Sequence, residues 1–166
     1  MIAHNRFFLQ PRTDSMFEIQ TLADSLGGIS LQPGEQAPAS GAYALVLRVE
    51  KRIRARTGSH GLLVFGPGLY LYAGRAARGL PSRLARHLRR NKPVRWHIDR
   101  LTNRREAEVQ DIIVIPDKPG LECEIVRVCL RRAPAWVPIP RFGNGDCREG
   151  CPSHLLRFEE PGSGRS

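Results

Sequence analysis

The chain has 166 residues, of which 41% are hydrophobic and 7% aromatic, so its apolar material suits one core of ordinary domain size and excludes two full domains. It contains no run of about 18 apolar residues, which excludes a membrane-spanning helix, and its N-terminus lacks the basic start and apolar stretch of a secretion signal. We therefore expect an intracellular, cytoplasmic protein with no membrane partner and a formal charge of +10.

The two ends of the chain differ in composition from the middle. Residues 1–40 show weak periodicity and finish in a run rich in Pro, Gly and Ser over 32–40, which predicts a flexible extension or linker. Residues 159–166 are polar and rich in Gly, which predicts a frayed tail. The folded domain is accordingly expected over residues 41–158.

Regular elements alternate within this domain. In chain order, the patterns predict a strand over 42–49, a basic hairpin over 52–65, a strand over 69–73, a helix over 80–90, a short helix over 96–101, a strand over 109–115 and a helix over 121–132. In the first strand, Tyr43, Leu45, Leu47 and Val49 share one face. The order predicts an α/β (α+β) domain with a small central three-stranded antiparallel sheet flanked by helices.

Positive charge is concentrated between the second strand and the third. Residues 75–105 carry eleven basic side chains and one acidic one, and so much charge of one sign is typical of a surface that binds a polyanion. Nucleic acid is the polyanion that we expect, with association to the nucleoid, although a solubilising face, an anionic membrane or an acidic protein would also fit. The candidate contacts are Arg75, Arg78, Arg86, Arg89, Arg90, Lys92, Arg95 and His97.

Two predicted helices carry residues suited to phosphate chemistry. Arg83 and His87 stand four apart and so share a helix face, a pairing suited to holding phosphate and moving protons but also common on solvated faces. Glu122 opens the last helix, where it either complements the helix dipole or serves as a hard oxygen ligand for Mg²⁺ or Mn²⁺. Spacing alone does not decide between these roles.

A second group of residues has the character of metal ligands. Cys147, Cys151 and His154 follow one another at a spacing compatible with zinc, with Cys123 or Cys129 as a fourth ligand. The alternative is that the thiols are small half-buried side chains and that His154 donates a hydrogen bond or contacts phosphate. A zinc-organised interaction domain is one function class that this group leaves open.

Two tyrosine triplets link these observations to a known family. Gly-Ala-Tyr at 41–43 opens the first strand, Tyr-Ala-Gly at 72–74 closes the second, and Arg83 and Glu122 follow on helices. This order resembles the GIY-YIG nuclease superfamily. The later motifs Phe-Gly-x-x-Asp-Cys at 142–147 and Ser-His-Leu at 153–155 resemble a less-studied branch of it, found alone or fused to an endonuclease III-type glycosylase.

The resemblance implies a divalent-metal-dependent endonuclease that hydrolyses phosphodiester bonds in DNA, directed to a structure or a lesion in DNA repair. The implied catalytic residues are Tyr43, Tyr72, Arg83, His87 and Glu122. Glu122 would hold Mg²⁺ or Mn²⁺, Arg83 would stabilise charge on the phosphate, and Tyr72 would orient water or phosphate. The general base stays open between Tyr43 and His87.

The fused relatives further imply a functional link to a base-excision glycosylase. The principal rival function is a catalytically inactive module that binds DNA, or RNA, on the same scaffold.

Overall fold

The computed structural model of the protein describes residues 14–32 and 34–160. Its main sheet is antiparallel and six-stranded, in the order β1-β6-β2-β5-β8-β7, and β3 pairs with β4 in a separate two-stranded sheet. The strands are β1 (Ile29–Ser30), β2 (Gly41–Val49), β3 (Ile53–Thr57), β4 (Gly61–Phe65), β5 (Gly68–Ala76), β6 (Ala107–Pro116), β7 (Ala135–Trp136) and β8 (Leu155–Phe158).

The prediction of a small three-stranded sheet is therefore wrong. The three strands expected from periodicity are β2, β5 and β6, which form the middle of the sheet. The other three have only two to four residues each. Segments this short carry no recognisable alternation, and tertiary pairing rather than local pattern makes them strands.

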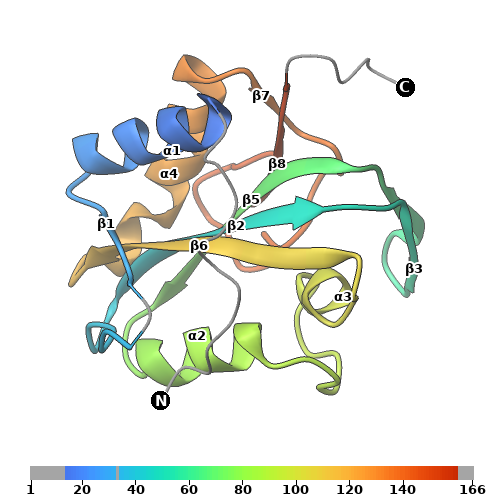
Figure 1. The fold of residues 1–166 in the computed structure, drawn as a ribbon, viewed down its shortest axis with the longest axis horizontal. Coiled ribbons are helices and arrows are strands. Elements are labelled where there is room, and N and C mark those ends of the chain that lie inside the picture. The colour runs from blue at the N-terminus through green and yellow to red at the C-terminus, as the bar shows by residue number, and fades with distance from the viewer. Residues whose placement is uncertain (1–13, 33, 161–166) are drawn as a thin grey trace.

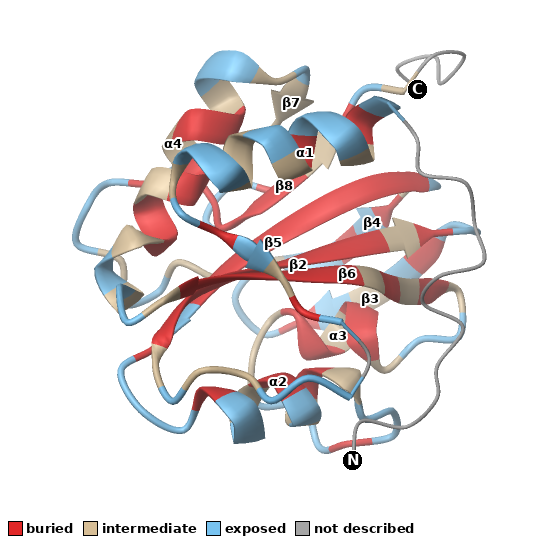
Figure 2. Ribbon diagram, turned by 60° about the vertical axis from the view of Figure 1, so that its left-hand side comes forward, coloured by how far each residue is buried: buried red, intermediate tan, exposed pale blue. Residues whose placement is uncertain are grey.

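The register of β2 and β5 brings the two tyrosine triplets together. Tyr43 lies directly opposite Gly74, and Tyr72 lies opposite Leu45 two positions along, so both phenols are on the same face of the sheet. The expectation that these strands are neighbours is confirmed. Both strands are buried almost throughout, so β2 has a core on each face rather than on one (Figure 2).

Helices cover the two faces of the sheet (Figure 1). They are α1 (Asp14–Ser25), α2 (Leu80–Leu88), α3 (Asp99–Thr102) and α4 (Glu122–Arg132), with a 3-10 turn η1 (Pro119–Leu121) before α4. α1 and α4 lie on one face, and α2 and α3 lie on the other. In α2, Leu80, Leu84 and His87 are buried, and Pro81 stands in the first turn, where its missing N–H costs no helical hydrogen bond.

The ends of the chain contribute to the fold more than their composition predicts. The expected flexible extension over 1–40 contains α1 and β1; Ile19 of α1 is 2% exposed, and β1 pairs with β6. In the expected tail, Glu160 accepts a hydrogen bond of 2.8 Å from Arg48. Burial of apolar side chains on α1 and this charge pairing explain the differences. Residues 1–13, 33 and 161–166 of those predictions lie outside the described residues.

None of the helices formed by the described residues has the length and apolar character needed to cross a membrane.

Candidate functional site

A cleft of about 320 Å³ lies where β2 begins, β5 ends and α4 starts. Four of the five predicted catalytic residues line it: Tyr43, Tyr72, Arg83 and Glu122. They come from β2, β5, α2 and α4, so the fold brings together side chains that are far apart in sequence. The cleft is thus the place where any chemistry of these groups takes place.

The fifth predicted residue, His87, lies behind the cleft wall rather than in it. Its side chain is 1% exposed, and its Nε2 lies 2.7 Å from the hydroxyl of Tyr43. Burial lowers the pKa of His87 to about 3, against a weaker opposing effect of Asp99, so the ring is neutral at neutral pH. Among the described residues, none bonds its Nδ1. His87 therefore contacts the phenol and not the open cleft.

Each phenol rests against a glycine from another segment. A Cβ at Gly74 would lie 2.4 Å from the hydroxyl of Tyr43, and a Cβ at Gly143, where φ is 72°, would lie 2.7 Å from the ring of Tyr72. Burial raises the pKa of both phenols above the ordinary tyrosine value, and the charge of Arg83 opposes this in both. The two hydroxyls therefore stay protonated at neutral pH in this environment.

Arg83 is held by an aromatic surface. Its guanidinium lies 4.8 Å from the ring centroid of Trp96, and Arg86 lies 4.4 Å from the same ring. Trp96 also lines the cleft and is half-buried, so its ring is both a packing residue and a support for the cation.

Glu122 is the buried carboxylate of the cleft. It is 5% exposed at the first turn of α4, and its Oε1 lies 3.2 Å from Nε of Arg75. Burial raises the pKa of Glu122, and the charge of Arg75 opposes that shift. Nη2 of Arg75 also lies 3.5 Å from Oδ2 of Asp146, an exposed carboxylate on the cleft wall. Two carboxylates near one cation are hard oxygen donors of the type that Mg²⁺ and Mn²⁺ prefer.

Most of the expected nucleic-acid contacts are accessible. The exposed or cleft-lining members of that set are Arg75, Arg78, Arg89, Arg90, Arg95 and His97. His97 accepts a hydrogen bond at Nδ1 from the backbone N–H of Gly143, at 3.0 Å. Arg90 is exposed but donates to the carbonyl oxygens of Arg104 and Ala107.

Lys92 and Arg86 have a different role from the one predicted. Lys92 is 4% exposed and donates to the carbonyl of Arg89 at 2.7 Å and to the hydroxyl of Thr102 at 2.8 Å. Arg86 donates at 2.8 Å to Asp99, a carboxylate that is 0% exposed. The prediction is wrong for Lys92, because a buried carboxylate, Asp99, draws nearby cations inward and leaves Lys92 out of reach of a surface ligand.

The cysteine cluster, formed by Cys123, Cys147, Cys151 and His154, has ligand atoms that all lie within 4.8 Å of one another. Sγ of Cys123 is 3.6 Å from Sγ of Cys147 and 3.9 Å from Nε2 of His154. Tetrahedral coordination with bonds of about 2.3 Å separates donor atoms by roughly 3.7 Å. The cluster could therefore hold a metal ion. Of the two cysteines considered for the fourth position, Cys123 is in place and Cys129 is buried in the core instead.

Comparison with known proteins places this architecture in a family. The family model described as "Domain of unknown function DUF123" matches residues 42–164. The chain belongs to the DUF123 family. No curated protein and no solved structure matches the chain.

The DUF123 match covers the cleft and the cysteine cluster completely, and it begins one residue before Tyr43. Helix α1 and strand β1 precede it and are additions to the matched region. Apart from alanines and glycines, the cleft-lining residues that were not among the predicted site residues are Trp96 and Asp146. Asp146 precedes Cys147 in the motif at 142–147. Its position beside a predicted metal ligand is the sequence feature that could have identified it as a site residue.

Proposed function

We propose that this chain is a divalent-metal-dependent endonuclease of the GIY-YIG type that hydrolyses phosphodiester bonds in DNA. One observation carries the proposal: Tyr43, Tyr72, Arg83 and Glu122 line a single cleft although they come from four separate elements. Two phenols, a guanidinium and a carboxylate form a donor set suited to one phosphate group and one hard cation.

The roles follow from where each group lies. Arg83 donates to a non-bridging phosphate oxygen, where its positive charge stabilises negative charge that builds up in the transition state. Glu122 would hold Mg²⁺ or Mn²⁺, which when bound neutralises phosphate charge and stabilises the leaving oxygen. Arg75 must move off the Glu122 carboxylate for this, and it then becomes available to phosphate.

The Tyr43–His87 pair orients the attacking water. Tyr43 lines the cleft and His87 lies behind it, so we assign the contact with water to the phenol and the positioning of that phenol to His87. A histidine with a pKa of about 3 is a weak proton acceptor at neutral pH, which argues against His87 as an independent base. Tyr72, which lies on the neighbouring strand β5, donates a hydrogen bond from its hydroxyl to the phosphate or to the water.

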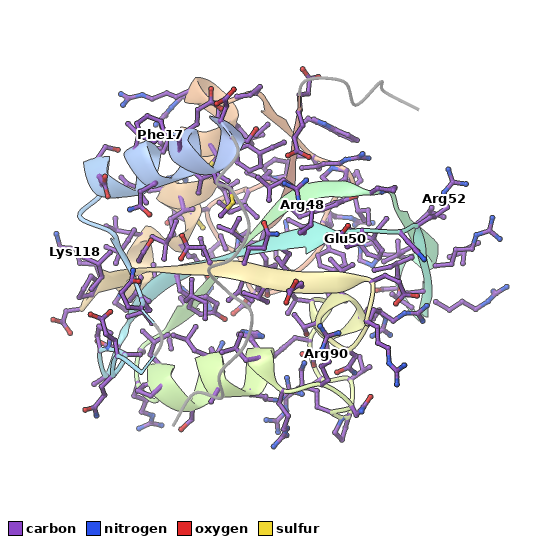
Figure 3. All side chains as sticks on the ribbon, viewed as in Figure 1. Phe17, Arg48, Glu50, Arg52, Arg90 and Lys118 are labelled. Atoms are coloured by element: carbon purple, nitrogen blue, oxygen red, sulfur yellow. The ribbon has the colours of Figure 1, made fainter. Side chains whose placement is uncertain are left out.

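The basic surface that would bind DNA extends beyond the expected block. In the β3–β4 hairpin, Arg54 pairs opposite Val64 and Arg56 pairs opposite Leu62, and all four side chains are exposed. Arg52, at the start of the hairpin, also projects into solvent (Figure 3). The rings of His60 and His97 are 5.0 Å apart, so the hairpin turn adjoins the cleft. Residues 51–98 contain no acidic side chain, so this surface is suited to phosphate.

A cleavage panel tests the proposal. Purified protein with Mg²⁺ or Mn²⁺ is incubated with nicked, abasic, branched and single-stranded DNA and with matched RNA. We expect cutting of at least one DNA substrate and at least a hundredfold loss in Glu122→Gln and Arg83→Gln. Glu108→Gln, on β6 away from the cleft, is the matched control and should leave the rate unchanged. Cutting of RNA alone would change the substrate class.

The second candidate is a catalytically inactive module that binds DNA or RNA, and the Arg75–Glu122 ion pair is the observation that favours it. A carboxylate already paired with an arginine is less available to a cation. If binding to DNA persists with no cutting of any substrate, or if cutting is indifferent to Tyr72→Phe and Glu122→Gln, this candidate replaces the nuclease.

We further propose that the metal of the cysteine cluster is zinc, because three thiolates and one imidazole are soft and borderline donors that zinc prefers to Mg²⁺. Elemental analysis of purified protein should give one zinc per chain. Less than a tenth of an equivalent after purification with added zinc would refute the assignment.

A further inference from the structure

The cysteine cluster and the cleft share the same pieces of chain. Cys123 follows Glu122 in the first turn of α4, and Cys147 follows Asp146 on the cleft wall. His154 belongs to the cluster and also lines the cleft. Three of the four cluster residues are therefore cleft residues themselves or adjacent to one along the chain, and a shift of the cluster moves the cleft wall.

The segment 143–153, which carries Cys147 and Cys151, is held by single hydrogen bonds and surface ion pairs rather than by regular secondary structure. No helix or strand occurs between β7 and β8, a stretch that the structure describes throughout. Its ends are fixed: Phe142 is 0% exposed, and the backbone N–H of His154 donates to the carbonyl of Phe142 at 2.9 Å. Between those ends most residues are at least partly exposed, and the contact of Glu149 with Arg127 at 2.8 Å is a surface ion pair.

One contact from this segment reaches the cleft directly. The backbone N–H of Gly143 donates to Nδ1 of His97 at 3.0 Å, and the ring of Tyr72 packs against Gly143. The position of the segment therefore sets the space around a phenol and an imidazole of the cleft.

We propose that the metal ion of the cysteine cluster clamps segment 143–153 onto α4, and that this clamp holds the cleft wall carrying Asp146 in its working position. The activity consequence rests on the proposed function, whereas the ordering of the segment does not. Four metal–ligand bonds would join α4, the segment and His154, the residue before β8. These bonds would fix the segment in the way that regular secondary structure, which it lacks, fixes other parts of the chain. The metal thus acts on catalysis through geometry, without touching the phosphate.

The test compares two cysteine variants of the full chain. Cys151→Ser removes a ligand that does not line the cleft, and Cys129→Ser, the matched control, changes a buried cysteine of α4 outside the cluster. Three quantities are measured for each: zinc per chain, amide hydrogen exchange of residues 142–154, and the rate of DNA cleavage with Mg²⁺ present.

We expect Cys129→Ser to keep the zinc, the exchange rates and the cleavage rate of the unsubstituted protein. Cys151→Ser should lose zinc, exchange the amide of Gly143 and its neighbours at least tenfold faster, and cut at least tenfold more slowly. Amides of α2 should keep their exchange rates, which distinguishes local loosening from unfolding. If Cys151→Ser does not fold, removal of zinc from the unsubstituted protein with a chelator and its restoration give the same comparison.

The proposal is overturned if zinc is lost and exchange over 142–154 stays within twofold, or if no zinc binds and added zinc leaves exchange unchanged. If the protein cuts no DNA, the exchange measurement still decides whether the metal orders the segment. Failure of the nuclease proposal is then separate from failure of the clamp.

Discussion

The hydroxyl of Tyr43 lies 2.7 Å from Nε2 of His87, and both side chains are almost completely shielded from solvent. The pair connects β2 to α2 through the middle of one core. A neutral imidazole is required there, because a charged ring in this position would be desolvated without a compensating carboxylate contact. The consequence is a dependence of stability on pH.

Acid should destabilise the fold through His87. Its pKa is about 3 in the folded protein and about 6.5 when unfolded, so between these values the unfolded chain binds more protons. The contribution of neutral His87 is complete above about pH 6.5 and declines by roughly 1.4 kcal/mol per unit as pH falls toward 3. Urea unfolding at pH 7, 5.5 and 4.5 measures it. His87→Gln should show a shallower decline than His60→Gln, and equal slopes would contradict the assignment.

Gly74→Ala should displace the phenol of Tyr43. The added Cβ would lie 2.4 Å from Cζ and from the hydroxyl oxygen of Tyr43, so the ring, which is 1% exposed, would have to shift. We expect a loss of about 1–3 kcal/mol in unfolding free energy and at least a tenfold drop in cleavage rate. Gly120→Ala meets nothing within 4 Å and is the control. An unchanged cleavage rate in Gly74→Ala would remove Tyr43 from the reaction.

Trp96→Leu should lower cleavage by releasing Arg83. The guanidinium of Arg83 loses the ring 4.8 Å away that fixes its direction, while its charge is kept. We expect kcat to fall about tenfold and KM to change less than threefold. Trp136→Leu is the matched control, because the guanidinium of Arg157 lies 5.5 Å from the ring centroid of Trp136 and Trp136 does not line the cleft. Equal effects of the two substitutions would indicate general destabilisation.

The hairpin arginines should contribute to DNA affinity through charge. Replacing Arg54 and Arg56 with Gln removes two exposed cations beside the cleft and should reduce the slope of log K against log salt by about two. Affinity is measured by fluorescence anisotropy from low to moderate salt. The control replaces Arg131 and Arg132 of α4, exposed on the other side of the sheet. A larger effect of the α4 pair would relocate the binding surface.

Sequence reasoning found the elements whose pattern is local. The alternation of Tyr43, Leu45, Leu47 and Val49 identified β2, although β2 is buried on both faces. The spacing of Leu80 and Leu84 identified α2, because both patterns lie within the element itself. The four residues that the family resemblance groups together, Tyr43, Tyr72, Arg83 and Glu122, line one cleft.

It failed where a partner from elsewhere decides the outcome. β8 is a strand because β5 and β7 pair with it. Lys92 is buried because the carboxylate of Asp99 lies near its ammonium group and the hydroxyl of Thr102 accepts a hydrogen bond from it. His87 has a neighbour on β2 that spacing along α2 does not reveal. These are long-range contacts, whose identity depends on the assembled fold rather than on the neighbouring residues.

The position of β8 in the sheet has a consequence for biosynthesis. Of the strands that the described residues form, this one is made last, yet it sits between β5 and β7. The residue before it, His154, accepts a hydrogen bond at its carbonyl oxygen from the backbone N–H of Ala73. A ribosome extending the chain from its N-terminus must release residues 155–158 before β5 gains its second neighbour. Until then one edge of β5 has no strand paired with it and can pair with other chains, so the pairing of β8 with β5 removes an aggregation-prone edge.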